Sequence, residues 1–84
     1  MMPKPGRKPT VSDAEILRKI AAFPDPVITS VELADAIDMT QQGAYSRLES
    51  LESEGFVRSK KVGSRARVWW ITDRGRQQLS YSES

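Results

Sequence analysis

Two short amphipathic segments joined by only three residues constrain the fold of this chain most strongly. Residues 30–37 and 41–54 each carry apolar side chains at helical spacing, which predicts two helices. Thr29 and Glu32 form a capping-box pattern at the start of the first helix, where each side chain binds the other residue's backbone N–H. Asp38 is placed to end that helix, because aspartate tolerates the left-handed backbone that helix ends often require. The sequence therefore predicts two helices that meet at a tight turn.

Further helical patterns flank this pair. Ser12 begins a segment with a capping-box pattern and apolar residues at helical spacing, and Pro24 ends it. Thr72 can cap a short final helix that runs to about Leu79. We expect residues 80–84 to fray.

A β-hairpin is predicted between the paired helices and the final helix. Residues 56–62 and 65–72 are rich in β-formers and are separated by a Gly-Ser pair. Glycine at the first central position, here Gly63, is typical of a two-residue type II′ turn. That turn would place Lys60 opposite Arg67 and gather basic residues at the hairpin tip.

These elements define one domain over residues 12–79. Its predicted class is α+β, mainly α, with a three-helix core, a two- to three-stranded hairpin and a short C-terminal helix. The β-branched pair at 27–28 suffices for one bridge to the hairpin. The paired helices form the helix-turn-helix pattern, whose second helix can enter the major groove of DNA.

The first turns of this second helix are polar and contain no acid. Gln can make a bidentate pair with adenine N6 and N7, while Ser and Thr can bond to bases or phosphates. The acids Glu49, Glu52 and Glu54 follow in the last turns, where a helix inserted in the groove has left the DNA. An ordinary exposed helical face is the alternative interpretation. The predicted readers are Thr40, Gln41, Gln42, Tyr45, Ser46 and Arg47.

Charge is unevenly distributed along the chain. The formal net charge is only +2, but residues 57–84 carry seven Lys or Arg against two acids, and residues 11–56 carry nine acids against three bases. Basic clusters attract polyanions, and nucleic acid is the commonest polyanion in a cell. The pattern favours a nucleic-acid partner, with a solvated surface that only maintains solubility as the alternative.

Composition excludes several classes of function. The chain has no cysteine and no histidine, which removes disulfide scaffolds, thiolate or imidazole metal sites and His-based triads. No apolar run approaches the ~20 residues of a membrane helix, and residues 1–6 lack the apolar region of a secretory signal. We expect a cytoplasmic, nucleoid-associated binding protein and not an enzyme. No cofactor, metal, membrane or small-molecule site is expected.

Residues 1–11 predict a flexible basic arm, because prolines and Gly6 oppose regular structure there. The arm loosely resembles the basic tracts of AT-hooks, although the segment 5–9 lacks that motif's central Gly-Arg-Pro. A leader that makes no DNA contact is the alternative. The candidate DNA contacts in the arm are Lys4, Arg7 and Lys8.

Three fragments in order resemble the winged helix-turn-helix transcription regulators, especially the small MarR-like and ArsR-like proteins of archaea and bacteria. Glu32-Leu33-Ala34 matches the family's "eLA", residues 47–57 (RLESLESEGFV) match "rLe.Le..Glv", and residues 69–75 (WWITDRG) match "LT..G". The chain departs from the family at Asp38, where glycine is frequent, and at Ala44, where a branched apolar residue is usual. The resemblance implies double-stranded DNA as partner, a recognition helix over 40–54, and a wing that contacts phosphates or the minor groove. The implied wing residues are Lys60, Lys61, Ser64, Arg65 and Arg67.

The resemblance leaves two questions open. Winged helices also serve as protein-interaction or assembly modules, and the acidic middle of the chain fits that alternative. Family members are usually dimers, so we expect a homodimer built from the C-terminal helix and one outward tryptophan. Adjacent strand residues point to opposite faces, so only one of Trp69 and Trp70 can pack under the hairpin. The other is expected to cover the final helix, to stack with Arg58 or to face a second subunit.

Overall fold

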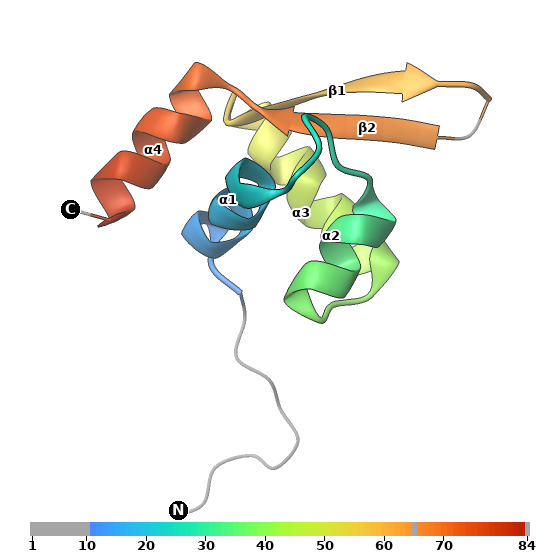
Figure 1. The fold of residues 1–84 in the computed structure, drawn as a ribbon, viewed down its shortest axis with the longest axis horizontal. Helices are drawn as coiled ribbons and strands as arrows, with labels where there is room; N and C mark the ends of the chain where they lie inside the picture. Colours follow the sequence, from blue (N-terminus) through green and yellow to red (C-terminus); the bar gives the residue numbers. More distant parts are fainter. Residues whose placement is uncertain (1–10, 65, 84) are drawn as a thin grey trace, which may run out of the picture.

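A computed structural model describes residues 11–64 and 66–83 of the chain (Figure 1). Among these residues three helices precede a β-hairpin, and a fourth helix follows it. The elements are α1 Asp13–Ala22, α2 Ser30–Ile37, α3 Gln41–Ser53, β1 Val57–Val62, β2 Ala66–Ile71 and α4 Asp73–Glu83. The predicted mainly helical α+β arrangement is confirmed. In Figure 1 the hairpin projects at one end of the molecule and α4 extends at the other.

The turn between α2 and α3 is built as the sequence predicts. The Thr29 hydroxyl accepts a hydrogen bond from the Glu32 backbone N–H at 3.1 Å, and the Glu32 carboxylate accepts one from the Thr29 N–H at 2.9 Å. Asp38 ends α2 in the left-handed conformation, with φ 57° and ψ 52°. The Thr40 hydroxyl then accepts from the Gly43 N–H at 3.0 Å. Local hydrogen bonds thus fix the start of α2 and the start of α3, and Asp38 ends α2 between them.

The core lies where α1, α2 and α3 meet the base of the hairpin. Each helix contributes fully buried leucines, such as Leu17, Leu33 and Leu48, and β2 contributes Trp69, which is 1% exposed. Burying one such leucine stabilises the fold by about 1.5–3 kcal/mol. The core also contains Ile16, Ile20, Ile28, Ala34, Ile37, Ala44, Leu51, Val57 and Ile71.

The hairpin register differs from the prediction by one residue. Val62 pairs with Ala66, so three residues separate the paired strands and the predicted two-residue turn is wrong. A slip of one residue sends every side chain of a strand to the other face. The observed register places Val57 opposite Ile71, and both side chains are buried against the helices. The predicted register would have put these two residues on opposite faces, so core packing overrides the turn rule.

A β-bridge and the final helix complete the fold. Ile28 and Trp69 exchange two backbone hydrogen bonds of 2.9 Å, which confirms the predicted bridge. Thr72 caps α4, because its hydroxyl accepts from the Gly75 N–H at 3.0 Å. The predicted end near Leu79 is wrong, since α4 runs to Glu83. The residues after Leu79 include no glycine or proline, so nothing in the sequence stops the helix there.

Candidate nucleic-acid interface

The exposed face of α3 presents polar side chains around a shallow hollow. Gln42 and Ser46 are exposed and lie four residues apart, which puts them on one side of the helix. Tyr45 is half-buried, and its ring meets the Trp69 ring edge-on at 5.6 Å between centroids. The hollow has a volume of about 540 Å³ and is lined by Gln41, Gln42, Tyr45, Ser46 and Glu49.

Arg47 lies outside this hollow. Its guanidinium Nη2 is 2.7 Å from the Asp13 carboxylate oxygen Oδ1, and its side chain is 25% exposed. The pair joins α3 to the first turn of α1. Because Arg47 is held on α1, the structure does not bring it together with Gln42 and Ser46.

Glycine at position 43 makes room for the turn. A β-carbon at Gly43 would lie 3.0 Å from the Thr40 hydroxyl oxygen and 3.2 Å from the Met39 Cγ. A side chain there would therefore crowd the cap that starts α3. This crowding explains why glycine stands at position 43, although glycine inside a helix is about 1 kcal/mol less favourable than alanine.

The hairpin of β1 and β2 is the wing of this fold. It brings basic side chains to a second hollow beside α3, which we call the basic hollow. Cross-strand partners share a face of the hairpin, and Lys61 pairs directly with Arg67. Both residues line a hollow of about 530 Å³ between the wing and the first turns of α2 and α3. The other lining residues are Thr29, Ser30, Val31, Gln41, Tyr45, Ser64 and Ala66. Gln41 and Tyr45 line both hollows, so the polar face of α3 continues into the basic face of the wing.

Arg67 connects the wing to α3. Its Nη1 donates to the Ser59 hydroxyl at 2.8 Å, and that hydroxyl donates to the Glu52 carboxylate at 2.9 Å. The Arg67 guanidinium carbon also lies 5.9 Å from the centroid of the Trp69 ring. The chain of contacts fixes the base of the wing against the second half of α3.

Lys60 occupies the opposite face of the hairpin. It pairs with Val68 and not with Arg67, as a consequence of the corrected register. Arg58 and Trp70 are the next cross-strand pair on that face. The structure therefore brings Lys61, Ser64 and Arg67 to the α3 side of the wing, but not Lys60. Arg65 and the arm residues Lys4, Arg7 and Lys8 lie outside the described residues.

The order of helices, turn and wing agrees with one family of known proteins. Residues 10–58 match the model of the winged helix-turn-helix DNA-binding family. The chain belongs to that family. No curated protein sequence matches it. Membership confirms the resemblance inferred from the three sequence fragments.

Solved structures share the winged helix-turn-helix fold of this chain. The transcriptional regulator BldR of Sulfolobus solfataricus is 28% identical with a TM-score of 0.71, over 83% of this chain and 50% of that chain. A MepR variant of Staphylococcus aureus bound to an oligodeoxyribonucleotide is 17% identical with a TM-score of 0.74. The match covers 81% of this chain and 51% of the MepR chain. The zinc-responsive MarR family member ZitR of Lactococcus lactis is 18% identical with a TM-score of 0.70. The match covers 93% of this chain and 54% of the ZitR chain. The chain spans about half the length of these structures.

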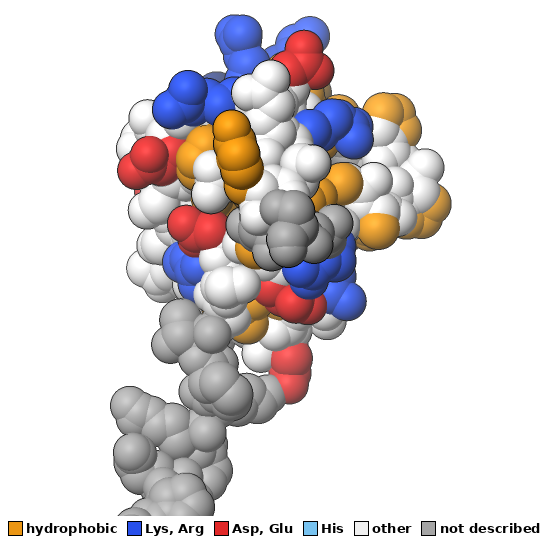
Figure 2. All heavy atoms as spheres, turned by 90° about the vertical axis from the view of Figure 1, so that its left-hand side faces the viewer, with side chains coloured by type: hydrophobic (Ala, Val, Ile, Leu, Met, Phe, Trp, Pro, Cys, Tyr) orange, Lys and Arg blue, Asp and Glu red, His pale blue; other side chains and the backbone are white. Residues whose placement is uncertain are grey.

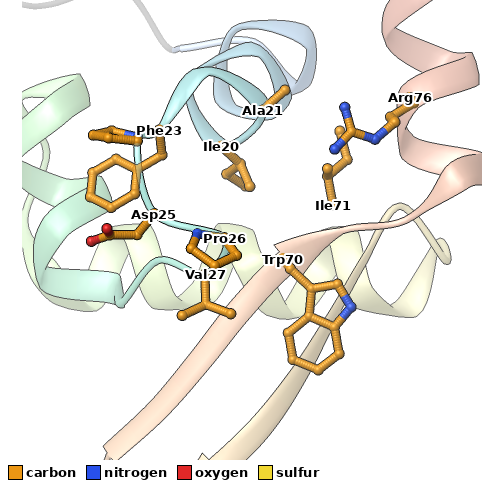
Figure 3. A pocket seen from close by; sticks show the side chains of 10 residues that line it. Ile20, Ala21, Phe23, Asp25, Pro26, Val27, Trp70, Ile71 and Arg76 are labelled. Carbon is orange, nitrogen blue, oxygen red and sulfur yellow. The ribbon is translucent and has the colours of Figure 1, made fainter.

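Trp70 borders a hollow at the far side of the winged helix domain. Trp69 is the buried tryptophan, whereas Trp70 is half-buried. A hollow of about 550 Å³ lies between the end of α1, residues 23–27 and α4. Figure 3 shows Pro26 and Val27 on one side of this hollow and Trp70 and Arg76 on the other. The predicted dimer contact at an outward tryptophan stays a prediction, with Trp70 as its residue.

The end of the molecule that carries α4 has a mixed surface. Figure 2 faces that end and shows acidic and basic side chains interspersed with apolar ones. No helix among the described residues is long and apolar enough to cross a membrane. In the same residues no group of three or more His, Cys, Asp or Glu side chains is arranged to hold a metal ion.

Sequence reasoning missed two groups of residues that line these hollows. The N-terminal turn of α2, with Val31 50% exposed, borders the basic hollow. Glu49 lines the α3 hollow, although the sequence interpretation placed it beyond the DNA. The spacing contains a signal for Glu49, because it follows Gln42 by seven residues, or two helical turns.

Proposed function

We propose that this protein binds double-stranded DNA and regulates transcription. One observation supports the proposal above the others: Lys61 and Arg67 lie directly opposite each other in the hairpin and border the polar face of α3. Like charges directly opposite each other destabilise a sheet. An anion that binds between Lys61 and Arg67 would offset this repulsion. A phosphate backbone beside α3 supplies that anion.

In this proposal the two hollows have different tasks. α3 enters the major groove, where Gln41, Gln42 and Ser46 meet base edges and choose the sequence. The α3 side of the wing, with Lys61, Ser64 and Arg67, contacts phosphates or the adjacent minor groove and supplies affinity. Arg65 adds one more basic residue to the wing. The basic arm, with Lys4, Arg7 and Lys8, adds further phosphate contacts. Occupancy of a promoter then blocks or recruits the transcription machinery.

A second copy of the chain would supply symmetry. Helix-turn-helix dimers bind two half-sites about 34–36 Å apart, and each copy gains affinity from the other. We propose the surface around Trp70 and α4 for this contact, because Trp70 is half-buried and Tyr81 is 78% exposed. Such a regulator acts in the cytoplasm, where the DNA of a nucleoid is accessible.

A protein-interaction module is the second candidate. The nine acids of residues 11–56 favour it, since a DNA-binding domain has no need of an acidic body. Binding of an unrelated protein partner would survive neutralisation of Lys61, whereas DNA binding would weaken. This difference separates the two candidates.

Selection of bound duplexes from a random pool tests the proposal. We expect a defined motif for the wild type, altered bases for Gln42→Ala, and an unchanged motif with weaker binding for Lys61→Ala. Each good bidentate pair discriminates by about 1–3 kcal/mol. If the wild type binds no duplex even at low salt, the protein is not a DNA-binding regulator. If both variants change the motif in the same way, the division between reading and anchoring is wrong.

A further inference from the structure

The two acids of α3, Glu49 and Glu52, and the acid at its C-cap, Glu54, have different surroundings. The Glu52 carboxylate accepts a hydrogen bond from Ser59 at the base of the wing. Glu54 is the C-cap of the helix, and its backbone carbonyl accepts from the Arg74 side chain at 2.9 Å. Glu49 is exposed and lines the same hollow as Gln42 and Ser46. Only Glu49, among these three acids, therefore faces the ligand that the polar surface of α3 would meet.

A carboxylate at this place is a disadvantage unless it has a partner in the DNA. Phosphates repel it, and no Lys or Arg is among the residues that line the hollow. Arg47, the basic residue of α3, is already bound to Asp13. Glu49 is thus not neutralised by any residue that lines the hollow, and a hydrogen-bond donor on a base would compensate its charge.

We propose that Glu49 reads cytosine in the major groove; this inference rests on the DNA-binding function proposed above. Cytosine presents the N4 amino group as a donor, whereas guanine presents only acceptors at N7 and O6. Thymine presents the O4 acceptor and a methyl group, and adenine places an acceptor beside its donor. A carboxylate only accepts, so it matches cytosine and is repelled by the acceptors of the other bases.

Helix geometry gives the distance between this contact and the one made by Gln42. Seven residues of α-helix span about 10.5 Å at about 1.5 Å per residue. Base pairs follow each other at about 3.4 Å along a strand, so the two side chains reach bases up to about three steps apart. The predicted site therefore contains an adenine for Gln42 and, within about three base pairs, a cytosine for Glu49.

Selection from a random duplex pool with four proteins tests the inference. The set is the wild type, Glu49→Gln, Glu49→Ala and the control Glu54→Gln, which removes the same charge from the same helix outside the hollow. Glutamine prefers adenine, so Glu49→Gln should exchange one selected cytosine for adenine. Glu49→Ala should lose the preference at that position, and Glu54→Gln should keep the wild-type motif. Titration of the wild type should show at least about a fivefold loss of affinity when the cytosine is replaced.

The outcomes separate this inference from the proposed function. If the wild type and Glu49→Gln select the same bases, Glu49 does not read DNA, and the DNA-binding function stands. A uniform gain of affinity in Glu49→Gln with no change of motif also overturns the inference, because it indicates repulsion from phosphates alone. If the wild type binds no duplex, both fail. Thermal unfolding of the Glu49 variants should match that of the wild type, since the side chain is exposed.

Discussion

The opposite faces of the wing offer a matched pair of variants. Lys60 and Lys61 are neighbours, both exposed, but only Lys61 faces α3 and lines the basic hollow. Lys61→Ala and Lys60→Ala remove the same charge, so any difference between them comes from position. We expect Lys61→Ala to weaken binding of every duplex and Lys60→Ala to leave binding nearly unchanged.

The size of the difference follows from electrostatics. Two unit charges about 4 Å apart in water interact by about 1 kcal/mol, so losing one phosphate contact weakens binding about fivefold. The slope of log K against log salt should become shallower by about 0.9. Between 50 and 200 mM salt, the wild type should therefore lose about 3.5-fold more affinity than Lys61→Ala. Lys60→Ala should change affinity by less than about twofold, because salt screens exposed charges over about 10 Å.

Fluorescence anisotropy of a labelled duplex, titrated at several salt concentrations, measures both quantities. Equal losses of affinity and equal slopes for the two variants would refute the reasoning, because the register could then not decide which lysine meets the DNA. A larger effect of Lys60→Ala would place the DNA on the outer face of the wing, beside Trp70.

Three further predictions concern stability and are measured by urea unfolding. Gly75→Ala should destabilise the domain strongly, because a β-carbon there would overlap the Phe56 carbonyl oxygen. Thr40→Ala should lower the free energy of unfolding by about 0.5–2 kcal/mol, since the cap on the Gly43 N–H is lost; Thr40→Ser should retain most of it. Leu48→Ala should cost about 2–5 kcal/mol, because the side chain is fully buried, and an exposed change such as Ser50→Ala should stay within about 0.5 kcal/mol.

Local signals predicted the helices well. Caps act through side chains and backbone groups only a few residues apart, so Thr29 and Asp38 could be recognised from sequence and were confirmed. The hairpin register could not be predicted in the same way. The turn residues favoured two-residue closure, but burial of Val57 and Ile71 on one face required the other register. That choice depends on helices distant in sequence.

The sequence predicted which residues belong to the candidate site better than it predicted where they lie and what they contact. The polar residues Gln42 and Ser46 follow from helical spacing, and the structure places both on one hollow. The partner of Arg47 could not be predicted, because Asp13 lies 34 residues away in the sequence. The faces of Lys60 and Lys61 likewise depend on the register of the hairpin, which the core decides.

An NMR titration of the full chain with its selected duplex tests the central claim most directly. The claim is that α3 and the α3 side of the wing together form the DNA-binding surface. We predict large amide shift changes in residues 41–46 and 61–66, and small changes in residues 76–81 of α4. Changes confined to α4 and the neighbourhood of Trp70, with residues 41–46 unaffected, would contradict it.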